Sequence, residues 1–290
     1  MVRPSRSYRV FQGVNGVVLT LVVLVTLYPF LNIVARSFSG ERQVRAGQVT
    51  LWPKGFSLTT YDIVFHDSMF WRNYGNTVFY TVVSTAVAMV LTTCYAYVLS
   101  KRHLKGRTAL IGVAVFTMFF TGGLIPNYVL VTSLGLKNTV WAIALPNAVS
   151  VFNLLVMKAF FESLPTELEE AAQIDGLSTY GILLRIVLPL SKAVVATMVL
   201  FYSVSFWNSW FSAFLYMDSS DLMPVTVYLR NLIAGVTGGG NAGATTEQLS
   251  QAGATIQSVA IVLTALPILC VYPFVQRYFV SGVMLGAVKG

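Results

Sequence analysis

Charge is scarce in this sequence. Only 10% of its 290 residues are Asp, Glu, Lys or Arg, whereas 56% are hydrophobic, and the mean hydropathy is +0.70. Histidine and cysteine are rarer still, with two of each. Cys94 and Cys270 lie inside apolar stretches and lack the close spacing of zinc ligands or of a disulfide framework, so the sequence predicts neither kind of site.

The motifs of common hydrolases are also missing. The chain has no GxxxxGK[ST], GxSxG or HExxH pattern, and the glycine-rich run Gly235–Thr246 contains no lysine. These absences argue against a nucleotide hydrolase, a serine hydrolase of the common elbow type and a zinc protease. We therefore expect a protein that is not an enzyme and that holds no cofactor of its own.

What the chain has in abundance is long apolar stretches. Six of them reach about 20 residues, the length that crosses a bilayer as a helix, and apart from Lys158 none contains Asp, Glu, Lys, Arg or His: Val14–Ala35, Asn76–Leu99, Ala109–Ser133, Thr139–Phe160, Val194–Tyr216 and Ile256–Val275. The sequence predicts an all-α polytopic membrane protein, one domain over residues 1–290 with six transmembrane helices. Gly122–Pro126 (GGLIP) is expected to bend the third.

Basic residues indicate the orientation. The segment Lys101–Arg107 holds four Lys or Arg residues, and three arginines precede the first stretch. Because cytoplasmic loops are enriched in Lys and Arg, we expect both termini and the loop 162–192 on the cytoplasmic side of the cell inner membrane. The loop 217–255 then lies outside, with a flexible middle rich in Gly, Ala, Thr and Gln. A short ordered segment is expected before that middle, at Met223-Pro224 and Tyr228–Leu232.

Acidic residues are concentrated in one segment of the chain. Five of the eleven acidic residues fall between Glu162 and Asp175, in ESLPTELEEAAQIDG. Thr166 and Glu169 have the spacing of a capping box, and Gly176 suits a left-handed C-cap, so the pattern predicts a helix over about Glu167–Ile174. Its small apolar face is expected to consist of Leu168, Ala171 and Ala172.

A helix lying on an anionic leaflet usually carries Lys and Arg. This predicted helix carries acid instead, which favours docking on a basic groove of a cytoplasmic protein over contact with lipid. A merely solvated loop is the alternative.

The same residues carry a resemblance. The segment Glu170–Pro189, EAAQIDGLSTYGILLRIVLP, resembles the EAA loop of ABC importer permeases, and the matching positions are Glu170, Ala171, Ala172, Gly176, Ile186, Leu188 and Pro189. LYPFLNIVARSF and FSLTTYDIVF resemble sugar permeases of the maltose type, on the side of the smaller six-span subunit. FTGGLIPNYVLV and FYSVSFWNSWFSAF are similar to a branch that handles complex oligosaccharides, alginate among them.

The resemblance implies a permease subunit that imports an oligosaccharide by alternating access. Its implied partners are a second permease, two ATPase subunits that hold ATP and Mg²⁺, and an external solute-binding protein. The EAA helix would be a coupling helix in a cleft of the ATPase, with these coupling residues: Glu169, Glu170, Ala171, Ala172, Asp175 and Gly176. From the residues alone, Glu167 and Glu169 are expected mainly to cap the helix.

A substrate path for sugar needs aromatic faces and amide groups. The candidates are Asn153, Phe206, Trp207, Asn208 and Trp210, with Trp207 and Trp210 expected on one helical face. Helix packing is the alternative explanation for this cluster. An alginate cargo would favour cations along the path, and the predicted spans offer none at depth.

Two other functions stay open. One is an ABC permease for a non-sugar solute, because the loop motif does not report the cargo. The other is an ion-coupled secondary transporter, although such carriers usually place ionisable groups within the membrane.

Overall fold

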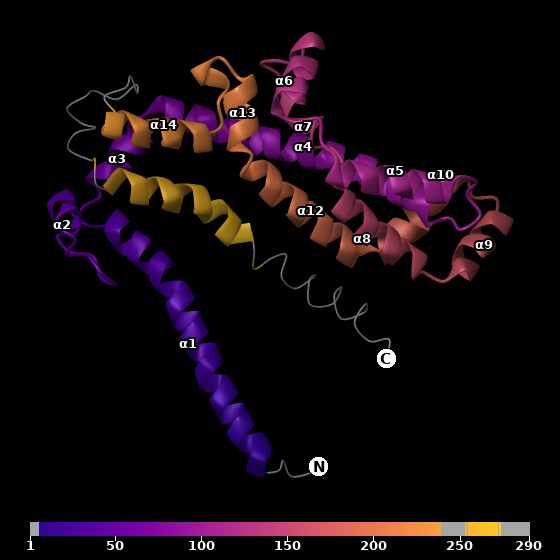
Figure 1. Cartoon of the computed structure of the whole chain (residues 1–290), viewed down its shortest axis with the longest axis horizontal. Helices are drawn as coiled ribbons and strands as arrows, with labels where there is room; N and C mark the ends of the chain where they lie inside the picture. Colours follow the sequence, from indigo (N-terminus) through magenta and orange to yellow (C-terminus); the bar gives the residue numbers. More distant parts are fainter. Residues whose placement is uncertain (1–5, 239–252, 254, 272, 274–290) are drawn as a thin grey trace. The chain divides into compact units, whose positions relative to one another are not determined.

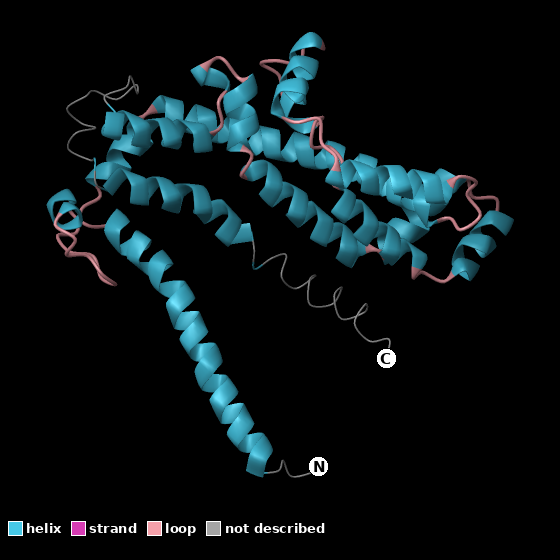
Figure 2. Cartoon of the chain, in the orientation of Figure 1, coloured by secondary structure: helices cyan, strands magenta, loops and turns pink. Residues whose placement is uncertain are grey.

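The computed structural model describes residues 6–238, 253, 255–271 and 273. Among these residues the regular structure is helical, with no β-strand, which confirms an all-α fold (Figures 1 and 2). The described residues divide into two compact units. One runs up to Phe70 and includes the part from Leu229 to Leu266, and the other is Trp71–Tyr228 with the part from Pro267 onward.

The first unit contains a helix that is apolar on every side. α1 (Arg6–Ser37) exposes its large hydrophobic side chains from Val10 to Leu31, as expected for a helix whose surroundings are lipid or another membrane helix. Its end is held by polar contacts. The Asn32 amide donates to the carbonyls of Val49 and Thr50, and the Tyr61 hydroxyl donates to Ser37 at 2.9 Å.

The short helices α2 (Glu41–Arg45) and α3 (Thr59–His66) follow in the same unit. The long helix α4 (Ser68–Ser100) then leads into the second unit. The elements after α4 are α5 (Arg107–Phe119), α6 (Leu124–Ser133), α7 (Trp141–Ala144), α8 (Val151–Glu162), α9 (Thr166–Ile174), α10 (Thr179–Ile182), the π-helical turn η1 (Leu183–Val187), α11 (Leu188–Leu190), α12 (Lys192–Trp207), α13 (Trp210–Tyr216), the 3₁₀ turn η2 (Ser220–Leu222) and α14 (Val225–Gly238).

Two continuous described helices are long and apolar enough to cross a bilayer, Val10–Ser37 within α1 and Ser68–Ser100. Two bent pairs, α5 with α6 and Thr179–Leu190 with α12, would raise that number to four. The apolar helix Thr255–Val271 is shorter. The prediction of six spans therefore stays a prediction.

The expected bend in the third apolar stretch is confirmed. α5 and α6 meet at 112°, and Gly123 between them has φ +86°, a conformation that residues with a Cβ rarely adopt. Glycine and proline in GGLIP thus break the helix where the sequence places them.

Helices are also interrupted in two other stretches that were predicted as spans. In Thr139–Phe160 the helix stops at Ala144 and restarts at Val151. In Val194–Tyr216 it stops at Trp207 and restarts at Trp210. The second break has a local cause, because the Asn208 amide donates to the carbonyl of Val204 and the Ser209 hydroxyl to that of Phe206. The backbone N–H groups of Asn208 and Ser209 bond to the same two carbonyls, so each side chain adds a second donor there and competes with continuation of the helix.

A buried tyrosine stabilises the first break. The Tyr202 hydroxyl on α12 accepts from the backbone N–H of Ser150 at 3.0 Å, just before α8. The same hydroxyl lies 2.6 Å from the Thr92 hydroxyl on α4. Three helices that are distant in sequence therefore share one polar junction, in a place where an unpaired backbone group would be costly.

The loop 217–255, predicted to lie outside, is ordered at its start. The backbone from Asp221 to Val225 is tied to α4 by Asn76, whose amide donates to the carbonyls of Asp221 and Met223, and by Tyr80 and Thr77. The ordered segment predicted at Tyr228–Leu232 is confirmed and belongs to the longer helix α14. The rest of the predicted flexible middle, residues 239–252, lies outside the described residues.

An ion pair closes the neighbouring loop. The Lys137 ammonium lies 2.8 Å from the Asp218 carboxylate, and Asn138 donates to the same carboxylate. The hydrogen bond from Lys137, followed by that from Asn138, lowers the pKa of Asp218. Because the pKa of Asp218 in the folded protein lies below its ordinary value, the ion pair stabilises the folded state at neutral pH. That stabilisation is lost as the pH falls through the lowered pKa.

The Tyr202 junction can be tested by removing one oxygen atom. We expect Tyr202→Phe to destabilise the purified protein by about 1–3 kcal/mol, since a buried N–H and a buried hydroxyl lose their shared partner. Thermal unfolding in detergent measures the change. The control is Tyr180→Phe, because Tyr180 is 76% exposed. Equal unfolding temperatures for the Tyr202 variant and the wild type would contradict the role of the junction.

Candidate functional site

The helix predicted in the acidic stretch is present as α9, Thr166–Ile174. The predicted capping box is wrong. Pro165 occupies the N-cap position and no side chain caps the helix start. Thr166 is already inside the helix, so it cannot serve as the cap, and Glu169 has a different partner. The carboxylate of Glu167 still lies in the first turn, where the helix dipole favours an anion.

The other end of α9 is as predicted. Gly176 has φ +79°. Its N–H donates to the carbonyl of Gln173, and the N–H of Leu177 donates to that of Ala172, both at 3.0 Å. This pair of bonds is a Schellman motif, and it turns the chain so that Leu177 packs beside the core that contains Ala172.

α9 presents one face to the outside. Glu167, Glu170, Ala171 and Ile174 are exposed and recur at the i, i+3, i+4, i+7 spacing of one helical face. Ile174 is 88% exposed. Leu168, Ala171 and Ala172, the predicted small apolar face, lie within α9 at the i, i+3, i+4 spacing of one helical face, and only Ala172 of the three is buried. Asp175, just after the helix, is exposed as well.

Glu169 points to the opposite side. Its carboxylate pairs with the ammonium group of Lys101, which follows the last residue of α4. The same ammonium lies 4.0 Å from the centre of the Tyr97 ring. Glu169 thus contacts this chain itself, whereas the coupling role predicted for it requires an exposed carboxylate.

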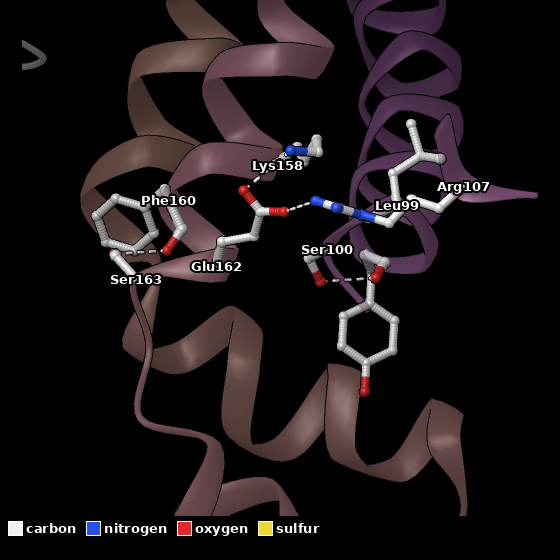
Figure 3. A network of polar contacts seen from close by, with 8 residues as sticks. Leu99, Ser100, Arg107, Lys158, Phe160, Glu162 and Ser163 are labelled. Atoms are coloured by element: carbon white, nitrogen blue, oxygen red, sulfur yellow. Dashed lines mark hydrogen bonds and ion pairs between the residues drawn. The ribbon is translucent and has the colours of Figure 1, made fainter. Parts of the chain in front are cut away.

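A second charged contact lies nearby (Figure 3). The guanidinium of Arg107, at the start of α5, pairs with the Glu162 carboxylate at the end of α8, and its Nε donates to the carbonyl of Leu99 at 2.7 Å. The other oxygen of Glu162 accepts from Lys158 at 2.9 Å. Lys158, the one charge in the predicted spans, is thereby neutralised by a residue one helical turn away.

A groove of about 610 Å³ lies where the basic segment after α4 meets α9. Lys101, Arg102 and His103 line one side, and Glu167, Glu169 and Glu170 line the other. No three His, Cys, Asp or Glu residues in the described part of the chain are grouped as ligands for a metal ion. The arrangement of exposed carboxylates beside an exposed isoleucine is suited to binding a protein surface.

The predicted substrate-path residues are not brought together. Phe206 and Trp207 are buried at the end of α12, where Trp207 packs edge-to-face on Tyr74 at 5.8 Å. Trp210 begins α13 and contacts Phe211 and Phe214. The expectation of one shared helical face is wrong, because the helix breaks between the two tryptophans.

Of the two amides, Asn153 is buried on α8 and Asn208 is exposed, bonded to its own helix. Trp207 also lines an apolar pocket of about 240 Å³ together with Thr81 and Ser203.

Two features of this site were not predicted from the sequence. Ile174 is the most exposed large hydrophobic residue of α9, and a helical projection of the stretch would have found it beside Glu170 and Ala171. The pairing of Lys101 and Arg107 with acidic residues more than 50 positions away left no local signal.

The comparisons with known proteins decide the family. The chain is 43% identical to Protein LplC of Bacillus subtilis over 99% of its own length and 97% of the relative. It is 41% identical to the polygalacturonan/rhamnogalacturonan transport system permease protein YtcP of the same species, over 94% of this chain and 96% of the relative. The chain belongs to the permease subunits of carbohydrate ABC transporters.

A solved structure agrees with this assignment. A chain of the crystal structure of a bacterial ABC transporter involved in the import of the acidic polysaccharide alginate matches with a TM-score of 0.86 and 33% identity, over 96% of this permease and 100% of that chain. No protein-family model matches. The resemblance drawn from the EAA loop is thus confirmed. The permease is a transport subunit and not an enzyme, with ATP hydrolysis on a separate subunit.

The C-cap of α9 makes a prediction that does not depend on transport. A Cβ at Gly176 would meet no atom within 4 Å, so Gly176→Ala should cost about 1–2 kcal/mol through backbone strain alone. The matched control is Gly75→Ala inside α4, where φ is ordinary and the space is also empty, and helix propensity there favours alanine. Thermal unfolding should therefore shift down for Gly176→Ala and not for Gly75→Ala. A downward shift of the same size in both variants would contradict the role of the left-handed turn.

Proposed function

We propose that this permease is one of two membrane subunits of an ATP-driven importer in the cell inner membrane. A second permease, two ATPase subunits carrying ATP and Mg²⁺, and an external solute-binding protein complete the assembly. The oligosaccharide crosses by alternating access. The observation that carries the proposal is the exposed face of α9, which points away from the rest of this chain. Glu170, Ala171 and Ile174 of the matched EAA segment are exposed together there.

α9 is the coupling helix in this proposal. Ile174 supplies the apolar contact for a cleft in the ATPase, with Glu170 and Asp175 as its charged neighbours, because interfaces combine an apolar centre with a polar rim. Ala171 lets the two surfaces approach closely. Ala172 and Gly176 act from within, Ala172 by packing α9 on the core and Gly176 by turning the chain toward α10.

The orientation gains support from the ion pairs. Positive charge favours the cytoplasmic side for the segment Lys101–Arg107. Lys101 contacts Glu169 and Arg107 contacts Glu162, so α9 lies on the same side as that segment. Both termini would then be cytoplasmic, as the six-span arrangement requires.

A uronic-acid oligosaccharide is the proposed cargo. One relative is named for polygalacturonan and rhamnogalacturonan transport and the similar solved structure for alginate import, and all of these polymers contain acidic sugars. Asn208 and Trp210 stay candidates for the path, whereas Phe206 and Asn153 are packed inside the fold. Trp207 is buried as well and stays a candidate only through the apolar pocket that it lines. The charge on the cargo would be met by the second permease or by the binding protein, because the one cation in the predicted spans is paired with Glu162.

Reversing the charge on α9 tests the coupling role. We expect Glu170→Lys to leave membrane insertion intact and to lower substrate-stimulated ATP hydrolysis of the reconstituted complex about tenfold or more, since the loss of about 1.4 kcal/mol at an interface is tenfold. Asp62→Lys, a reversal at an exposed acid of α3, is the control and should hydrolyse ATP as the wild type does. Full stimulation in Glu170→Lys would contradict the coupling role.

Uptake into proteoliposomes that contain the complete importer tests the cargo. We expect trigalacturonate or trimannuronate to be taken up in an ATP-dependent manner at least about tenfold faster than maltotriose, because a site built for carboxylates loses its ion pairs with a neutral sugar. Equal or faster uptake of maltotriose would overturn the acidic cargo. Uptake driven by an ion gradient without ATP would overturn the importer itself.

A further inference from the structure

The basic residues between α4 and α5 differ in burial and in pairing. We name Lys101–Arg107 the basic turn. Its first and last residues, Lys101 and Arg107, are partly buried and paired with Glu169 and Glu162. Arg102 and Lys105 in its middle are exposed. A turn whose only task was to carry positive charge on one side of the membrane would not need to bury its two ends.

The two acidic partners lie on both sides of one corner. Glu162 is the last residue of α8 and Glu169 lies within α9, with only Ser163, Leu164 and Pro165 between the two helices. The basic turn therefore holds the helix before the corner and the helix after it (Figure 3 shows the contact with Glu162).

The backbone of the corner is restricted, since the N–H groups of Ser163 and Leu164 still bond to the last turn of α8 and proline fixes φ at Pro165. The start of α9 has no side-chain cap. Ala172 packs α9 on the core, and the Lys101 pair is placed to hold the same helix from the end of α4.

These pairs are more withdrawn from water than ordinary surface ion pairs. The side chains of Lys101 and Glu169 are 21% and 18% exposed, and those of Arg107 and Glu162 are 26% and 22% exposed. Removing one partner leaves the other largely withdrawn from water without its counter-charge, which is costly. The Tyr97 ring adds a favourable face for the Lys101 ammonium.

We propose that the basic turn is a brace that fixes the orientation of α9, with Lys101 and Arg107 as positioning residues. The brace itself is a statement about this chain. Its consequence for transport rests on the proposed coupling role: force applied to α9 passes to the end of α4 and not into the link Ser163–Pro165.

Hydrogen exchange measures the brace directly. In the purified complex we expect Lys101→Met and Glu169→Gln each to speed amide exchange across Thr166–Ile174 at least fivefold. The charge swap Lys101→Glu with Glu169→Lys should return exchange to within twofold of the wild type, because it restores the pair with opposite sign. Arg102→Met removes a neighbouring, exposed cation of the same turn and should change nothing.

Two exchange results would overturn the brace. Either single variant exchanging like the wild type, or a charge swap exchanging as fast as the single variants, removes the pair as a positioning contact. If the single variants fail to assemble, assembly of the charge swap supports the brace, and failure of all three overturns it.

Transport separates this inference from the proposed function. With trigalacturonate as the probe, the single variants should hydrolyse at least threefold more ATP per molecule imported than the wild type does, and the charge swap should restore the ratio. A wild-type complex that imports no trigalacturonate counts against the proposed cargo, and the exchange result still decides the brace. Faster exchange with an unchanged ratio would overturn the passage of force through the basic turn.

Discussion

A charge withdrawn from water needs a partner, and in a chain as apolar as this one that constraint decides the structure at the site. Glu162 and Glu169 find cations at the two ends of the basic turn. Once those pairs form, α4, α5, α8 and α9 meet around one core that includes Tyr97, Leu99, Phe161 and Ala172. The acids left over on α9 then face outward, together with an exposed isoleucine. One side of α9 thus packs against this chain, and the opposite side is exposed and available to a partner.

The need of polar groups for partners also applies to the broken helices. A helix that stops inside an apolar stretch leaves backbone groups without partners. At one break the side chains of Asn208 and Ser209 add hydrogen bonds to the last carbonyls of α12, and at another the Tyr202 hydroxyl accepts from the N–H of Ser150. The breaks within predicted spans are therefore stabilised by hydrogen bonds, and they are places where the chain changes direction.

The sequence predicted what local chemistry controls. Glycine and proline in GGLIP predicted the bend, Gly176 predicted the C-cap, and the EAA segment predicted the family. Predictions from the sequence were wrong where contacts between residues distant in sequence determine the structure. The capping box needed Glu169, which pairs instead with a lysine 68 positions away. The shared face of Trp207 and Trp210 needed a continuous helix, and no glycine or proline near Asn208 signalled the break. The boundary between the two sides of α9 also depends on tertiary contacts that spacing alone does not report.

The most direct measurement is site-specific photo-crosslinking from Ile174 in the native membrane. A photoreactive amino acid at this position should give an adduct with an ATPase that carries a P-loop, identified by mass spectrometry, because Ile174 is 88% exposed on the outward side of α9. The same label at Phe120, exposed after α5, should give no such adduct. Crosslinks from Ile174 to lipid alone, or the ATPase adduct from Phe120 and not from Ile174, would contradict the assignment of α9 as the coupling helix.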